Sequence, residues 1–210
     1  MSFAKNKELI LSKNMIQDNP YLPLIDNIKE LVSITDNEAT LIMEAFEPKY
    51  LSKKETLLFK GDVSNHMRFI TKGCLRSYYI NKEGQEYIVQ FGVKNWWVND
   101  LYSYLTQTPA QHFVQALKPT TVLQIYRDKL EELFGKVPAM ERFFRIKMQN
   151  AYVANQNRTL KSMSETAESR YIDFIKRYRD IEQSVPQYMV ASYLGVTPEH
   201  LSTIRKKLHK

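Results

Sequence analysis

The chain has 210 residues, 43% of them hydrophobic, and a formal net charge of +7 at pH 7. This length allows one large domain or two modest ones with real cores. Cys74 is the sole cysteine, which excludes an intramolecular disulfide and a cysteine-held iron–sulfur or zinc cluster. No apolar run is long enough to span a membrane, and Met1–Pro20 lacks the apolar segment of a signal peptide. We therefore expect a cytoplasmic protein.

Positive charge is concentrated in the last third of the chain. Residues 1–137 carry 17 Lys and Arg against 16 Asp and Glu, whereas residues 138–210 carry 13 against 7. A basic C-terminal part suits contacts with nucleic-acid phosphates. Surface lysines that only confer solubility would give the same count.

The N-terminal part is expected to be helical. Residues 1–20 suit an arm or a short helix, and Leu22–Val32 and Thr35–Phe46 are predicted to be two helices. Thr35 and Glu38 have the spacing of a capping box at the start of the second helix.

Between Glu47 and Ile125, short runs rich in aliphatic and aromatic residues are separated by turn residues. Many short strands at close spacing predict an antiparallel β-sandwich or jelly roll. The predicted strands are Thr56–Phe59, Met67–Thr71, Leu75–Ile80, Glu86–Phe91, Trp96–Val98, Gln111–Leu117 and Thr121–Tyr126.

A long helix is predicted after the strands. A short helix at Asp128–Phe134, ended by Gly135, precedes a stretch from Pro138 to about Leu160 without internal Gly or Pro. Such a helix spans about 36 Å at 1.5 Å per residue and needs a cover, so we expect a homodimer through it. The alternative is a helix lying along its own domain. The expected seam is Met140, Phe144, Met148, Ala151, Asn155 and Arg158.

The last part of the chain has the pattern of a helix-turn-helix. A break is predicted at Ser162–Glu165, followed by a helix at Glu165–Arg179 and a connector at Ile181–Val185. Helix Gln187–Leu194 then ends at Gly195, which suits a left-handed turn position.

Thr197 is predicted to cap the final helix, with Pro198 at its first position. Apolar spacing turns Leu194, Val196, Leu201, Ile204 and Leu208 inward. An outward face with an acid, hydroxyls and bases is what major-groove reading requires. An ordinary αα-hairpin with a solvated face is the alternative. The candidate DNA-binding residues are Thr197, Glu199, Ser202, Thr203, Arg205 and Lys206.

This order of parts resembles the Crp/Fnr family of bacterial transcription regulators. The resemblance rests on the turn Lys60–Asp62, on Phe69–Arg76 and on Gly195–Glu199, while Trp96–Leu101 resembles a divergent, Bacteroidetes-type branch. It implies an α+β fold with an N-terminal antiparallel jelly roll of the cyclic-nucleotide-binding type. It also implies double-stranded DNA, a second copy of the chain and RNA polymerase as partners.

The resemblance divides the chain into three parts. Residues 1–137 would form the sensor domain, 138–162 the dimerisation helix and 163–210 the helix-turn-helix domain. The jelly roll would be a sensor that holds a small-molecule effector of unknown identity, or a vestigial sensor. The candidate ligand-binding residues are Asn99, Asp100, Leu101, Gln111 and His112.

Two departures from the family affect function. Cyclic-nucleotide binders of the family use Gly-Glu-Leu followed by Arg-Ser or Arg-Thr, and the Arg neutralises the phosphate. Here Asn99–Leu101 and Gln111–His112 stand at those places, so we expect no binding of cyclic AMP. In those binders the Glu holds the ribose hydroxyl. Asp100 could keep this role or serve as a turn or cap residue. On the reading helix Glu199 matches an acid that accepts from cytosine, but the family's arginines are absent.

Other chemistries find no support in the sequence. The four histidines lack metal-ligand spacing, and no phosphate loop, nucleophile elbow or paired carboxylates occur. We therefore expect neither an enzyme nor a bound metal or cofactor. The competing hypothesis is a small-molecule-binding or protein-interaction module that does not read DNA.

Overall fold

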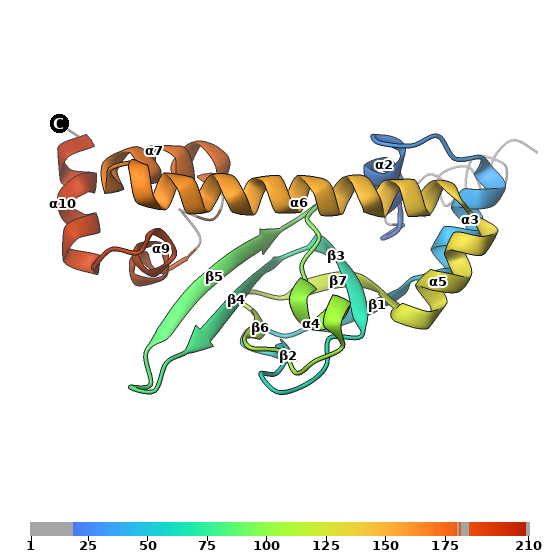
Figure 1. Cartoon of the computed structure of the whole chain (residues 1–210), viewed down its shortest axis with the longest axis horizontal. Coiled ribbons are helices and arrows are strands. Elements are labelled where there is room, and N and C mark those ends of the chain that lie inside the picture. Colours follow the sequence, from blue (N-terminus) through green and yellow to red (C-terminus); the bar gives the residue numbers. More distant parts are fainter. Residues whose placement is uncertain (1–18, 180, 182–184, 209–210) are drawn as a thin grey trace, which may run out of the picture.

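The computed structural model describes residues 19–179, 181 and 185–208. A single long helix, α6, runs along the molecule, with the β-sheets on one side of it (Figure 1). Helices α2, α3 and α5 lie at one end, and α7, α9 and α10 lie at the other. Most of the predicted N-terminal arm at 1–20 and most of the predicted connector at 181–185 lie outside the described residues.

The described chain is mixed α and β, as predicted. The helices are α2 (Leu22–Lys29), α3 (Asp36–Ala45), α4 (Leu101–Thr106), α5 (Arg127–Lys136), α6 (Ala139–Ser164), α7 (Ala167–Arg177), α9 (Gln187–Leu194) and α10 (Pro198–Leu208). The strands are β1 (Glu47–Leu51), β2 (Thr56–Leu58), β3 (His66–Lys72), β4 (Cys74–Ile80), β5 (Glu86–Val93), β6 (Phe113–Ala116) and β7 (Thr120–Tyr126).

The strands form two antiparallel sheets, with orders β1-β7-β3 and β2-β6-β4-β5. This is the predicted jelly-roll type of sandwich, and its inner faces share an apolar core. The prediction of a strand at Trp96–Val98 was wrong, because only an isolated bridge between Phe69 and Trp97 forms there. The two tryptophans pack on opposite sides of the segment: Trp97 against Phe69 and Trp96 against Tyr178.

Helix ends follow local hydrogen bonding. The capping box of α3 is present, with Thr35 and Glu38 bonded reciprocally. The predicted break at Ser162–Glu165 is present at its last residue, since α6 continues to Ser164 and Glu165 is extended. Ser162 is not the cap of the next helix, because it lies inside α6 and its hydroxyl donates to the carbonyl of Thr159. Thr166 caps α7 instead. Helix α5 likewise runs through Gly135 to Lys136.

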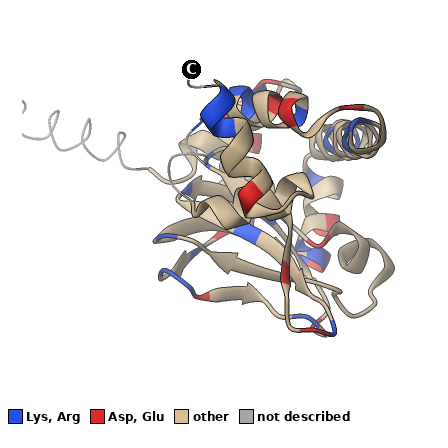
Figure 2. Cartoon of the chain, turned by 90° about the vertical axis from the view of Figure 1, so that its left-hand side faces the viewer, with Lys and Arg blue, Asp and Glu red and all other residues tan. Residues whose placement is uncertain are grey.

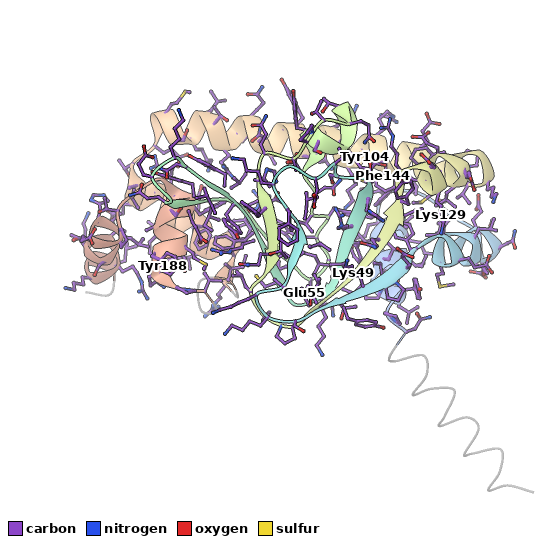
Figure 3. All side chains as sticks on the ribbon, turned by 90° about the horizontal axis from the view of Figure 1, so that it is seen from below. Lys49, Glu55, Tyr104, Lys129, Phe144 and Tyr188 are labelled. Atoms are coloured by element: carbon purple, nitrogen blue, oxygen red, sulfur yellow. The ribbon has the colours of Figure 1, made fainter. Side chains whose placement is uncertain are left out.

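The two halves of α6 have different surroundings. Met140 and Phe144 are buried in a core that α2, α3 and α5 share with the first sheet. Figure 3 shows Phe144 beneath the helix, on the side of the sheets. From Ala151 to Ser164 nearly every residue is exposed, including Tyr152 and Met163. The beginning of the expected dimer seam therefore lies along the chain's own domain, and only the second half of α6 lacks a cover in this chain.

Gly73 offers a test of the turn between β3 and β4. Its φ is +104°, and a methyl group there would lie 2.3 Å from Oγ1 and 2.5 Å from Cα of Thr120. Gly84 has φ +81° and open space around it. Gly84→Ala adds only the strained backbone, which costs about 1–3 kcal/mol, whereas Gly73→Ala adds the clash as well. Urea unfolding should show a larger decrease in the free energy of unfolding for Gly73→Ala than for Gly84→Ala. Equal decreases would contradict the close packing of Gly73 on Thr120.

Candidate DNA-reading helix and effector pocket

The turn between α9 and α10 has the predicted geometry. Gly195 adopts φ 69° and ψ 36°, in the left-handed region, and its N–H donates to the carbonyls of Ala191 and Ser192. The N–H of Val196 also donates to the Ala191 carbonyl, at 3.0 Å. The Thr197 hydroxyl accepts from the N–H of His200 at 3.2 Å, so it caps α10 as expected. The turn is therefore fixed by backbone hydrogen bonds to the end of α9 and by the Thr197 side chain at the start of α10.

The two faces of α10 separate as the apolar spacing predicts, with two exceptions. Leu201 and Ile204 are buried against α7 and α9, whereas Leu208 is 40% exposed. Arg205 is half-buried rather than fully outward. The outward, exposed candidates are Thr197, Glu199, Ser202, Thr203 and Lys206.

The charge on this helix is ordered along its axis. Glu199 lies in the first turn, and Arg205, Lys206 and Lys207 lie in the last. Figure 2 views this end of the molecule and shows basic segments close to the C-terminus. Lys207, which the sequence reasoning missed although it continues the basic run, pairs with Glu168 on α7 at 2.7 Å. A helix with an acidic and hydroxylated start and a basic end can contact bases first and phosphates later.

A cavity of about 520 Å³ opens at the second sheet. It brings together two predicted ligand residues, Gln111 and His112, with three that the sequence reasoning missed: Lys60, Tyr79 and Val89. The sequence signalled Lys60 only as part of a turn. Strand alternation alone could not show that Tyr79 and Val89 share a cavity with it.

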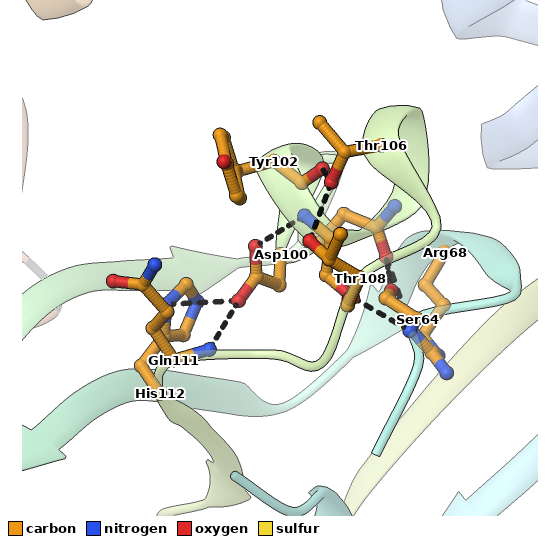
Figure 4. Close-up of polar contacts among 10 residues, drawn as sticks. Ser64, Arg68, Asp100, Tyr102, Thr106, Thr108, Gln111 and His112 are labelled. Carbon is orange, nitrogen blue, oxygen red and sulfur yellow. Dashed lines mark hydrogen bonds and ion pairs between the residues drawn. The ribbon is translucent and has the colours of Figure 1, made fainter. Parts of the chain in front are cut away.

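Asp100 holds the loop that borders this cavity (Figure 4). One carboxylate oxygen accepts from the N–H of Ser103 at 3.0 Å and thereby caps α4, which the sequence reasoning missed. The other oxygen accepts from the N–H of Gln111 at 3.3 Å and lies 3.2 Å from Nδ1 of His112. The side chain is almost fully buried. Both oxygens thus serve the loop in this structure, as a cap residue would.

The remaining predicted ligand residues lie elsewhere. Leu101 begins α4, and Asn99 turns away from the cavity to accept from Nη1 of Arg68 at 3.0 Å. Arg68 is only 5% exposed, and its other acceptors, the Ser64 hydroxyl and the His66 carbonyl, are neutral. Burial lowers its pKa to about 10, so it stays charged at neutral pH. This buried arginine, which no sequence pattern indicated, anchors the loop at its other end.

His112 does not supply a fixed positive charge. Burial lowers the pKa of His112, and the carboxylate of Asp100 opposes that shift only in part. A histidine whose pKa lies below its ordinary value of about 6.5 is mostly neutral at pH 7. Lys60 is the other basic side chain among the described residues that line the cavity. No grouping of His, Cys, Asp and Glu among the described residues could hold a metal ion.

The single cysteine does not offer a reactive thiol. Cys74 is buried, and burial raises the pKa of its thiol to about 11, so it remains a protonated thiol. Within the part of the chain that the structure describes, no helix is long and apolar enough to cross a membrane.

The pH behaviour of His112 can be measured directly. An NMR titration of the histidine ring should give a midpoint below the ordinary value, because burial disfavours the charged form. Asp100→Asn should lower the midpoint further, since it removes the charge that opposes burial. A midpoint that rises in Asp100→Asn would contradict the contact between these side chains.

A jelly roll joined by a long helix to a helix-turn-helix is the architecture of a ligand-responsive DNA-binding regulator. Residues 48–136 match the cyclic nucleotide-binding domain family. The anaerobic regulatory protein of Haemophilus influenzae is 29% identical over 192 residues, covering 85% of this chain and 73% of that protein. The fumarate and nitrate reduction regulatory protein of Vibrio cholerae is 26% identical over 192 residues, covering 85% and 75%.

Solved structures show the same fold. FixK2 from Bradyrhizobium japonicum superposes with a TM-score of 0.66 at 18% identity, covering 78% of this chain and 84% of that one. The catabolite activator protein of Thermus thermophilus gives 0.53 at 16% identity, covering 84% of each chain. These structures share the fold of the chain, and the sequence relatives, which are named as regulatory proteins, support a regulator of the Crp/Fnr type. The assignment to a Bacteroidetes-type branch stays a prediction.

Proposed function

We propose that the chain is a sequence-specific, DNA-binding transcription regulator that works as a homodimer. The observation that carries the proposal is the outward face of α10, which is exposed over Glu199, Ser202, Thr203 and Lys206 while its inner face is packed. A helix held this way in a helix-turn-helix enters the major groove. The curated relatives, named as regulatory proteins, support the same function. They also favour a regulator over an enzyme.

Dimerisation is supported by the uncovered half of α6. Met140, Phe144, Met148 and Tyr152 follow one another at intervals of four residues, and the first two are buried in the chain's own core. Tyr152 is 65% exposed, and Met163 is 79% exposed. At about 100° per residue these two side chains fall on nearly the same face. A second copy of α6 is the simplest cover for them.

The sensor is proposed to take an effector other than cyclic AMP. The family's cyclic-nucleotide binders neutralise the phosphate with an Arg, and Gln111 and His112, which stand at that place here, do not supply a fixed positive charge. An effector shifts the equilibrium between two arrangements of the reading helices only if it binds the protein more tightly in one arrangement than in the other. Contact with RNA polymerase, as for other regulators of the family, completes the proposal.

DNA reading can be tested by comparing two substitutions on α10. Glu199→Ala should relax the preference at one base-pair position per half-site by about 1–3 kcal/mol, because it removes a contact to a base edge. Lys206→Ala should weaken binding to all DNA sequences alike, because it removes a phosphate contact. It should also lower the slope of log affinity against log salt concentration by about 1. The measurement is a titration against a randomised duplex pool at two salt concentrations.

Lys129→Ala provides the control, because Lys129 is an exposed lysine at the opposite end of the molecule from Tyr188 and the helix-turn-helix (Figure 3). It should leave both affinity and salt slope unchanged. A wild-type protein that selects no sequence, with an affinity insensitive to salt, would instead support the interaction-module hypothesis.

The dimer can be tested with paired charges on α6. The double substitution Tyr152→Glu and Met163→Glu should give monomers, because it would bury unpaired carboxylates in the seam. Asn150→Glu with Asn157→Glu introduces the same charge on the opposite, exposed face and should leave the dimer intact. Sedimentation at micromolar concentration distinguishes the two. A wild-type monomer under these conditions would contradict the proposed dimer.

A further inference from the structure

The start of α7 lies where the long helix ends and the helix-turn-helix is attached. Helices α6, α7, α9 and α10 meet at one end of the molecule (Figure 1). Helix α6 ends at Ser164, and Glu165 is extended, with φ −106° and ψ 151°. Thr166 then caps α7 by accepting from the N–H of Ser169 at 3.2 Å. Side chains of the first turns of α7 are therefore close to the end of α6.

One of these side chains, Arg170, binds the ends of two different helices. Its Nη1 donates to the carbonyl of Ser162 at 3.2 Å and to that of Glu165 at 3.0 Å, both at the C-terminal end of α6. Its Nη2 donates to the carbonyl of Leu194 at 3.1 Å, at the C-terminal end of α9. The guanidinium thus bridges the long helix and the first helix of the helix-turn-helix.

The acceptors of Arg170 explain why an arginine suits this place. The last four carbonyls of an α-helix lack partners within the helix, and this end carries a negative partial charge. A guanidinium is always charged and holds its nitrogens in a rigid planar fork, so it can serve two helix ends at once. A lysine has the same charge on a single nitrogen and can serve only one of them.

Other contacts of the helix-turn-helix do not join it to α6 in this way. The Ser192 hydroxyl of α9 accepts from the N–H of Ile88 on β5 at 2.9 Å, which ties α9 to the sensor. Lys207 of α10 pairs with Glu168 of α7, but its side chain is 70% exposed, and exposed ion pairs contribute little to stability. Arg170 instead ties α9 to the helix that is proposed to pair in the dimer, through bonds to the backbone.

Arg170 is not placed to contact DNA itself. Both terminal nitrogens already donate to carbonyls, and the third nitrogen, Nε, is buried. Lys206, by contrast, is exposed on the outward side of α10. A loss of Arg170 should therefore affect where the reading helix is held and leave its contacts with bases and phosphates in place.

We propose that Arg170 is a positioning residue that sets the distance and rotation between the two reading helices of the dimer. It does so by fixing α9 to the end of α6, and α10 follows α9 because the turn at Gly195 is bonded to Ala191 and Ser192. The proposal rests on the proposed function as a dimeric DNA-binding regulator. It adds the residue that gives the dimer its preferred half-site spacing.

The first test compares duplexes that differ in half-site spacing. One extra base pair between the half-sites moves one of them by about 3.4 Å and rotates it by about 35°. The wild type should bind this duplex at least tenfold more weakly than the selected one. Arg170→Met should reduce this penalty at least threefold, because reading helices that are held loosely can follow the shifted half-site. Its affinity for a single half-site should change less than twofold, with an unchanged salt dependence.

The second test measures the bridge without DNA. Arg170→Met should speed hydrogen exchange at the amides of 161–166 and 191–197, because both helix ends lose a bonded cation. Arg170→Lys keeps the charge and can serve one helix end, so it should speed exchange at the other end and still lack the wild-type spacing penalty. It also carries the spacing test if Arg170→Met fails to fold.

Arg145→Met is the matched control. Arg145 is exposed on the first half of α6, and its guanidinium donates to Gln149 on the same helix. The same chemical change at this position should leave the spacing penalty and the exchange at 161–166 and 191–197 at their wild-type values.

Each contrary result has a distinct meaning. Unchanged exchange at both helix ends in Arg170→Met would overturn the bridge. Equal losses on single and paired half-sites, with a smaller salt slope, would make Arg170 a phosphate contact and overturn its positioning role while leaving DNA reading intact. A full spacing penalty in Arg170→Lys, or a wild type that tolerates the extra base pair, would overturn the control of spacing. If the wild type selects no sequence, the proposed function fails, and the positioning role fails with it.

Discussion

One constraint organises the molecule: α6 is an unbroken helix of 26 residues that its own sensor domain covers only over the first half. Burial of Met140 and Phe144 fixes the helix to the sensor, while the second half carries the helix-turn-helix away from that core. The exposed Tyr152 and Met163 form the proposed contact with a second copy of the helix. Helix α6 thus connects the jelly roll, the proposed dimer contact and the helix-turn-helix.

Residues 48–136 match the cyclic nucleotide-binding domain family, but the polar residues at the expected ligand positions make structural contacts. Asp100 caps α4 and holds the loop through the Gln111 N–H and His112, and Arg68 anchors the other end through Asn99. Little fixed charge is left in the cavity beyond Lys60. This lining supports the proposal that the effector is not cyclic AMP.

The sequence predicted the helix-turn-helix in detail because its signals are local. Gly195, Thr197 and Pro198 each act within one turn of their own position, and the apolar spacing placed Leu201 and Ile204 inward. Contacts between distant segments left no such signal. Ser192 and Ile88 are 104 residues apart, and a periodic pattern shows that one face of α6 is apolar without showing that the sensor itself covers Phe144. The role of Arg68 was hidden for the same reason, whereas the cap role of Asp100 was one of the two roles expected from the sequence.

The central claim is that α6 pairs two copies of the chain so that two copies of α10 face one side of a duplex. Hydroxyl-radical footprinting of the selected duplex tests this most directly. The account predicts two protected patches on the same face of the DNA, with centres about 34–36 Å, or one helical turn, apart. A single patch, or two patches on opposite faces, would contradict it.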